Sequence, residues 1–112
     1  MSNAFTDIHT LYVGDLTGEP LFGRKLVQAL QALGRFELPN DRALADAMLT
    51  AYGADEGEGF VGNMTISNLS GDVLWSGRAV RPHGSSGPMA YELLLAQMRT
   101  ALGITDSQSR TV

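Results

Sequence analysis

The sequence predicts an α+β fold, a two-layer sandwich in which two helices pack on one face of a mixed β-sheet. Two segments carry apolar residues at spacings of three and four, the pattern of a helix with one buried face. Other segments alternate apolar and polar residues, as strands buried on one side do. Short glycine-containing turns join the last of these strands, so we expect them to pair antiparallel.

The first part of the chain is expected to form a strand, a helix and a second strand. Residues 8–16 are rich in β-forming side chains and predict the opening strand. Residues 21–33 have one apolar stripe and predict the first helix, with Thr17 or Asp15 as a possible cap at its start. Residues 35–38 then predict a short strand.

The second part is expected to form a helical turn at residues 41–45, a three-stranded meander and a closing helix. The strands are predicted at residues 47–52, 60–69 and 73–80, and the helix at residues 89–102. The full order is therefore β-α-β-β-β-β-α. Both helices have a single apolar stripe, so we expect them to share one face of the sheet and leave the other face to solvent.

Length and composition indicate one domain, which we expect at residues 8–103 with flexible tails at residues 1–7 and 104–112. The chain has 112 residues, of which 44% are hydrophobic and 18% are charged. Its net charge of −4 and dispersed basic residues argue against a nucleic-acid partner. The absence of cysteine excludes disulfides and thiolate chemistry. No apolar run approaches the length of a transmembrane segment.

We find no pattern that predicts an enzyme. The histidines, His9 and His83, are far apart, and no known catalytic motif is present. A set of Ser85, His83 and Asp15 could be assembled, but almost any chain of this composition permits such a choice. The acidic turn at residues 53–59 lacks the spacing of a calcium loop, so a solvated hairpin tip is favoured there. We therefore expect no catalytic residue, no metal and no cofactor.

The loop at residues 81–88 is the best candidate for a ligand site. It contains glycines and hydroxyl groups, and it precedes a helix whose first N–H groups favour anions. We hypothesise weak phosphate or carboxylate binding there; the alternative is a simple connector in which Ser86 caps the helix. The candidate residues are Arg78, Arg81, His83, Ser85 and Ser86.

Two further features concern protein contacts. Trp75 lies in mid-strand and is expected to be a core residue under a helix, the alternative being an exposed anchor for a partner. The predicted strands at residues 35–38 and near 60–69 have no internal proline or lysine, residues that protect exposed sheet edges. We therefore predict docking of a protein partner, or self-association, by edge pairing or through an apolar patch.

Several segments together resemble a known bacterial domain. They are Val-Gly-Asp at 13–15, Ala-Leu-Gly-Arg-Phe-Glu at 32–37, Ala-Asp-Ala-Met-Leu-Thr at 45–50, Asn-Leu-Ser-Gly-Asp-Val-Leu-Trp at 68–75 and Met-Arg-Thr-Ala-Leu at 98–102. Across residues 11–102 the pattern resembles the small envelope α/β domain at the amino terminus of TolB and, in variants, in LpoB- and CsgG-like lipoproteins.

The resemblance implies a function and a location. It implies a non-catalytic module that docks onto partner proteins in the cell envelope, in the periplasm rather than the cytoplasm. The alternative function is a small-anion or small-ligand-binding domain that uses the loop before the last helix.

Overall fold

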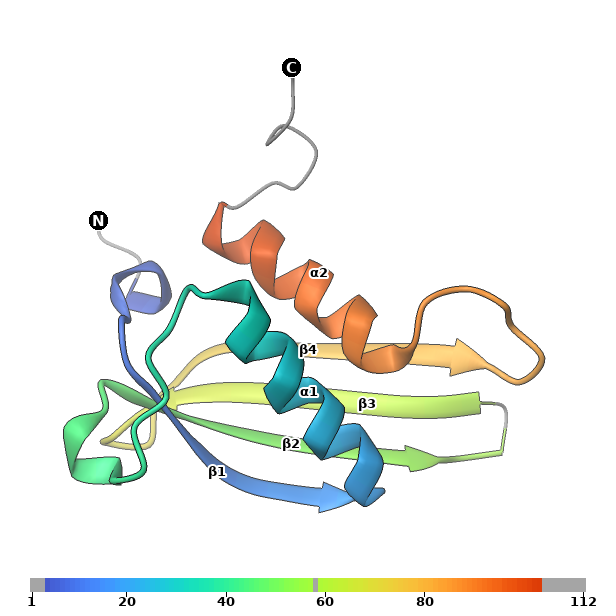
Figure 1. Ribbon diagram of the computed structural model, residues 1–112, viewed down its shortest axis with the longest axis horizontal. Coiled ribbons are helices and arrows are strands. Elements are labelled where there is room, and N and C mark those ends of the chain that lie inside the picture. Colours follow the sequence, from blue (N-terminus) through green and yellow to red (C-terminus); the bar gives the residue numbers. More distant parts are fainter. Residues whose placement is uncertain (1–3, 58, 104–112) are drawn as a thin grey trace.

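The computed structural model describes residues 4–57 and 59–103, and it confirms the two-layer α+β fold (Figure 1). Its elements are η1 (Ala4–Asp7), β1 (Leu11–Gly18), α1 (Pro20–Leu33), η2 (Arg42–Leu44), β2 (Ala47–Asp55), β3 (Gly59–Asn68), β4 (Val73–Pro82) and α2 (Ala90–Leu102). The strands lie in the order β1-β2-β3-β4, with β1 parallel to β2 and the other pairs antiparallel. The meander predicted from the short turns is confirmed.

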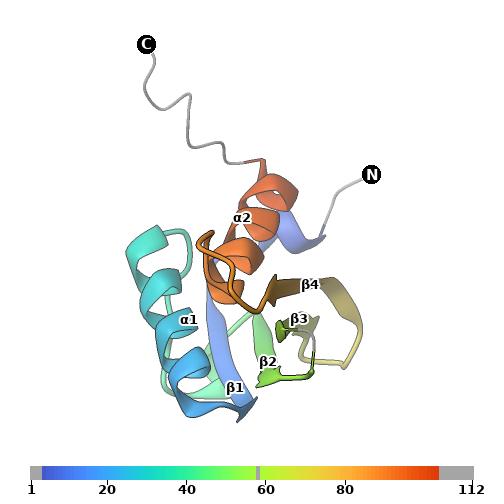
Figure 2. The same ribbon diagram turned by 90° about the vertical axis from the view of Figure 1, so that its right-hand side faces the viewer.

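Both helices cover the same face of the sheet, as the apolar stripes predict (Figure 2). Leu26 and Leu30 of α1, and Leu94 of α2, are fully buried against Leu49 and Ile66 of the central strands. Burial of one such side chain contributes about 1.5–3 kcal/mol to folding. The helices run in the same direction, so their N-termini lie together at one end of the sheet (Figure 1).

The opposite face of the sheet is not covered by a helix of the described residues, and it carries a polar row. Because side chains alternate along a strand, residues in register on neighbouring strands share a face. One row runs across the open face of all four strands through Thr17, Tyr52, Asn63 and Arg78. The residues of this row are half-buried or exposed.

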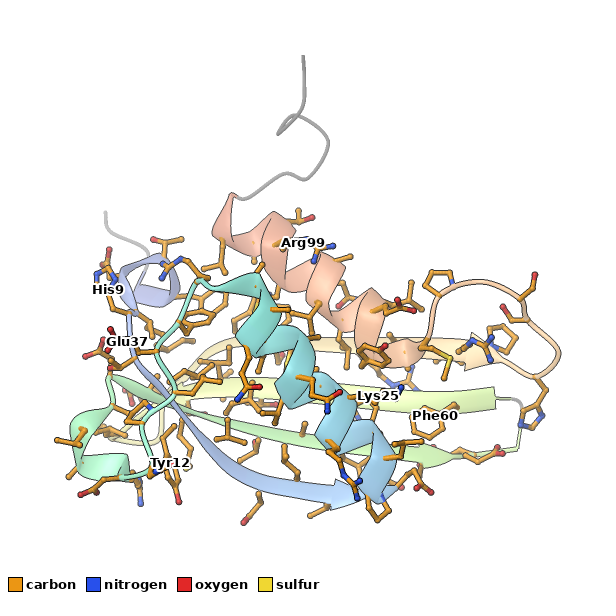
Figure 3. All side chains as sticks on the ribbon, in the orientation of Figure 1. His9, Tyr12, Lys25, Glu37, Phe60 and Arg99 are labelled. Carbon is orange, nitrogen blue, oxygen red and sulfur yellow. The ribbon has the colours of Figure 1, made fainter. Side chains whose placement is uncertain are left out.

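The strand predicted at residues 35–38 is wrong, because only Glu37 pairs there. Glu37 lies beside His9 at the start of β1 (Figure 3). Its N–H donates to the carbonyl of His9 at 2.9 Å, and its carbonyl accepts from the N–H of Leu11 at 2.8 Å. The next bond of a parallel ladder would need an N–H from Pro39, which has none, so the pairing stops after one bridge.

Residues 4–7 also depart from the flexible tail that we expected at residues 1–7. They form η1, and Phe5 is only 2% exposed. Its ring stacks on Trp75 with centroids 5.5 Å apart and planes 7° from parallel. Trp75 thus packs against the core, as predicted. Residues 1–3 and 104–112 of the expected tails lie outside the described residues.

Glycines end both helices, whereas the N-terminal caps differ from those that the sequence predicts. Gly34 and Gly103 adopt left-handed conformations after α1 and α2, with φ of 70° and 78°. Glu19, rather than Thr17 or Asp15, caps α1 by accepting from the N–H of Leu21. At the start of α2, Glu92 rather than Ser86 is the capping side chain. Its carboxylate accepts from the N–H of Met89 at 2.7 Å.

We predict that Phe5→Ala destabilises the fold by about 3 kcal/mol, because it removes a buried ring and its stacking partner for Trp75. Leu44→Ala is the control, because Leu44 is 67% exposed and its loss should cost less than about 0.5 kcal/mol. Urea unfolding followed by Trp75 fluorescence measures both. Equal stability losses in the two variants would contradict the packing of η1.

The pH dependence of Asp46 gives a second prediction. The N–H groups of His9 and Thr10 donate to Asp46 Oδ2 at 3.0 and 3.2 Å, and they hold the pKa of this carboxyl below its usual 3.8. A lowered pKa in the folded state stabilises the fold above the unfolded pKa, and this contribution is lost as the pH falls through the folded pKa. We expect Asp46→Asn to be less stable than the parent chain at pH 7.

The stability difference between Asp46→Asn and the parent should narrow steadily below pH 3.8. Urea midpoints measured from pH 7 to pH 2 give this difference directly. A gap that stays constant over the whole range would show that the charge of Asp46 does not contribute.

Candidate functional site

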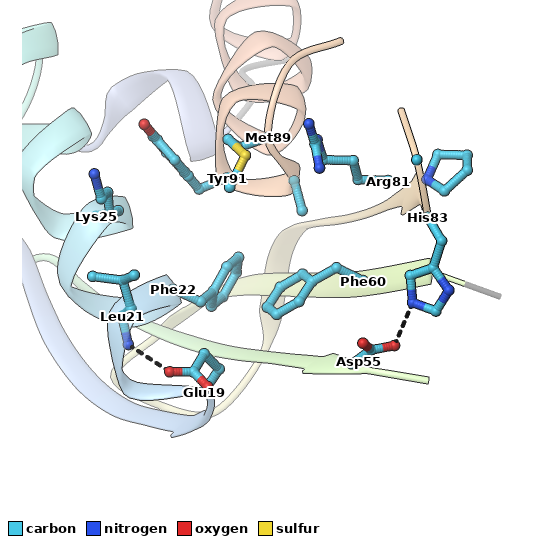
Figure 4. A pocket seen from close by; sticks show the side chains of 13 residues that line it. Glu19, Leu21, Phe22, Lys25, Asp55, Phe60, Arg81, His83, Met89 and Tyr91 are labelled. Carbon is cyan, nitrogen blue, oxygen red and sulfur yellow. Dashed lines mark hydrogen bonds and ion pairs between the residues drawn. The ribbon is translucent and has the colours of Figure 1, made fainter. Parts of the chain in front are cut away.

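A cleft of about 310 Å³ opens between the N-termini of α1 and α2 (Figure 4). It lies over the end of β2, the start of β3 and the end of β4. The parallel course of the two helices explains its position, since α1 and α2 both begin at this end of the sheet.

The floor of the cleft is aromatic. The rings of Phe22 from α1 and Phe60 from β3 lie with their centroids 5.5 Å apart. Gly53 and Gly62 pair across β2 and β3 directly beneath Phe22. A Cβ added at either glycine would come within 2.4 Å or 2.9 Å of the Phe22 ring. The two glycines therefore provide the space in which Phe22 lies.

Charged side chains surround this apolar floor. Lys25 of α1 and Arg81 of β4 line the cleft. His83 lies at its mouth, where its Nε2 is 2.8 Å from Asp55 Oδ1, and both side chains are exposed. Glu19 also lines the cleft, but its carboxylate accepts from the N–H at the start of α1.

Arg81 holds the loop between β4 and α2 in place. Its Nη2 donates to the carbonyl of Ser85 at 2.7 Å and to that of Gly87 at 3.4 Å, and its Nε also reaches Gly87 at 3.4 Å. The N–H of Gly87 in turn donates to Ser85 Oγ at 3.0 Å. Within residues 4–57 and 59–103, the guanidinium is bonded to carbonyls and forms no ion pair.

The structure brings together only part of the ligand site predicted from the sequence. Arg81 and His83 line the cleft, whereas Ser85 and Ser86 stay in the adjoining loop. Arg78 is in register with Asn63 on the open face and lines a shallow groove between β4 and α2. The anion site therefore stays a prediction, and its five residues do not share one pocket.

Sequence reasoning missed Lys25, Phe22 and Phe60 as lining residues. The sequence pattern predicts Phe22 as a core residue on the apolar stripe of α1. It predicts Lys25 on the solvated face of the same helix. Their neighbourhood depends on how α1 and β3 meet, which no local pattern encodes.

Asp15 lines a hollow on the open face, so it does not join His83, whose partner is Asp55. Across the part of the chain that the structure describes, no three metal-ligating side chains form a group, although Glu58 of the acidic turn lies outside it.

The edges of the sheet differ from those we expected. The strand near residues 60–69 is β3, which lies between β2 and β4, so its prediction as an edge is wrong. The edge strands are β1 and β4. On β4, Val73 is 62% exposed and Val80 is 38% exposed, and Gln97 Nε2 donates to the carbonyl of Arg78 at 2.9 Å.

No family model and no curated protein matches the chain in sequence. Solved structures do resemble it. TolB from Acinetobacter baumannii has a TM-score of 0.64 at 12% identity over 90% of this chain, which spans only 30% of the TolB chain. A PelC dodecamer from Paraburkholderia phytofirmans has a TM-score of 0.57 at 15% identity, over 87% of this chain and 88% of that one.

The LpoB C-terminal domain from Salmonella enterica has a TM-score of 0.51 at 14% identity, over 67% of this chain and 83% of that one. At sequence identities this low, the structural likeness shows a shared fold and nothing more. The predicted resemblance to the domain of TolB and LpoB is thereby confirmed at the level of the fold. Within the described residues, no helix is long and apolar enough to span a membrane.

We predict that Gly53→Ala displaces Phe22 and destabilises the fold by about 1–3 kcal/mol, because an added methyl group would overlap the Phe22 ring. Gly87→Ala is the matched control, since its Cβ would meet only Ser85 Oγ at 3.4 Å. Thermal unfolding and the NMR shifts of the Phe60 ring check the result. A Gly53→Ala variant as stable as Gly87→Ala would contradict the close packing of Phe22 on β2.

Proposed function

We propose that this chain is a non-catalytic protein-interaction module of a bacterial cell-envelope assembly, and that it docks through β4. The observation that carries the proposal is the free edge of this strand. β4 is 10 residues long, and among the described residues it has a strand neighbour on one side only. Its exposed Val73 and Val80 add apolar surface along the same strand.

An edge strand offers backbone N–H and C=O groups to a strand of another chain. β4 contains no lysine, and its only proline, Pro82, is its last residue. Gln97 occupies one backbone carbonyl of the strand, that of Arg78. β1 is the less suitable edge, because Glu37 bridges its start and a bulge lies between Val13 and Leu16.

The acidic and basic groups support a non-catalytic role, because many of them stabilise the backbone. Acidic side chains accept from backbone N–H groups at the starts of α1, η2 and α2, and Asp46 does so before β1. Arg35 donates to the carbonyls of Thr6 and Ile8, and Arg81 to those of its loop. These charged side chains therefore stabilise the backbone through hydrogen bonds to its N–H and carbonyl groups.

The envelope location is supported by the fold shared with TolB and the LpoB C-terminal domain. The PelC structure is that of a dodecamer, which is compatible with the use of such a fold in assembly. We therefore propose that this chain functions in the periplasm or at the cell envelope rather than in the cytoplasm.

Site-specific crosslinking tests the proposal, because the chain has no cysteine and any introduced thiol is unique. Val73→Cys and Val80→Cys carry a photoreactive maleimide on the β4 edge. Leu44→Cys carries the same group on η2 as the exposed control. We expect the β4 positions, in native-host cells, to give discrete adducts with an envelope protein or with a second copy, and the control to give none.

A lysine introduced on the edge of β4 provides a second test of docking through this strand. Adding Val80→Lys to Val73→Cys should abolish the adduct, because a charged side chain blocks strand addition, while the exposed site leaves folding intact. The proposal fails if β4 and Leu44 label the same proteins, if no adduct forms, or if fractionation places the chain in the cytoplasm.

A further inference from the structure

We propose that the cleft between α1 and α2 binds a small amphiphilic anion, an apolar chain or ring that ends in one carboxylate. This inference is independent of docking through β4. It also gives the small-ligand alternative a different site, one centred on the cleft rather than on the loop of residues 81–88.

The apolar part of the ligand matches the lining of the cleft. Phe22 and Phe60 form the floor, and Leu21 and Met89 stand at its sides. Leu21 is 51% exposed and Met89 is 46% exposed, so apolar surface at the starts of both helices is left uncovered. A ligand chain that covers this surface gains the free energy of removing it from water.

The size of the cleft favours a small molecule. Its volume of about 310 Å³ falls at the lower end of the range for small-ligand pockets. A polypeptide partner would need a larger and flatter surface than this cleft provides.

The charges around the cleft favour an anionic head group. Asp55 lies 2.8 Å from His83 Nε2, and Glu19 caps α1, so both acidic side chains already have a hydrogen-bond partner. Lys25 and Arg81 form no ion pair within the described residues. In Figure 4 they lie on opposite sides of the cleft, with the aromatic rings below them. A carboxylate bound beside Lys25 or Arg81 would therefore meet a cation that forms no ion pair within the described residues.

Matched probes that differ in one property test this chemistry. Octanoate has the chain and the anion, octanol has the chain alone, octylammonium has the chain and a cation, and inorganic phosphate is an anion alone. We expect octanoate to bind most tightly and to shift the amide NMR signals of Leu21, Phe60 and Met89. Added salt should weaken the binding of octanoate and leave the binding of octanol unchanged, since the two cations are partly exposed.

Three variants assign the head group. Lys25→Gln and Arg81→Gln should each weaken octanoate about three- to fivefold, the effect of a partly exposed ion pair, and leave octanol unchanged. Lys25→Arg should retain octanoate binding. Arg24→Gln is the control, because Arg24 is adjacent in sequence but lines a different hollow on α1. Lys25→Gln keeps the test valid if Arg81→Gln disturbs the loop.

Several results would overturn the inference. If octanoate binds no more tightly than octanol or octylammonium, the cleft does not select an anionic head group. If phosphate shifts only the amide signals of Gly84 and Gly87, the anion site is the loop of residues 81–88 instead. Equal effects of Lys25→Gln and Arg24→Gln would show non-specific attraction. If vesicles of phosphatidylglycerol sediment the chain while octanoate leaves the cleft signals unmoved, the surface binds a membrane instead.

Discussion

The burial of two apolar helix stripes against one face of a four-stranded sheet is the constraint on which the rest of this structure depends. α1 connects the parallel strands β1 and β2, and α2 returns over β3 and β4 in the same direction. This arrangement brings both helix N-termini to one end and creates the cleft there. Within the described residues it also leaves the opposite face without a covering helix and one edge of β4 without a strand neighbour, because a helix that covers a face does not pair with an edge.

β4 links the two proposed surfaces. Arg81 lines the cleft and ties down the following loop through the carbonyls of Ser85 and Gly87. Arg78 and Val80 lie on the same strand at the groove beside α2. The strand that offers its edge to a partner thus also supplies one wall of the ligand cleft. Alternation of side chains along the strand allows these two roles to coexist.

Sequence patterns predicted the parts of the fold that depend on local periodicity. They identified both helices and the meander. They missed the stacking of Phe5 on Trp75, because it joins residues 70 positions apart. In the candidate site, Arg78 and Arg81 are three residues apart on a strand, so alternation could have separated them in advance. The approach of Lys25 and Phe22 to Phe60 arises only from tertiary packing.

The most direct measurement of the central claim is solvent paramagnetic relaxation of methyl groups in the sheet. Thr65 and Ile66 are neighbours on β3, in register with Thr50 and Leu49 on β2, and they point to opposite faces. We expect a soluble gadolinium agent to broaden the methyl signals of Thr50 and Thr65 and to leave those of Leu49 and Ile66 sharp. Equal broadening, or protection of the threonine methyl groups, would contradict a sheet covered on one face only.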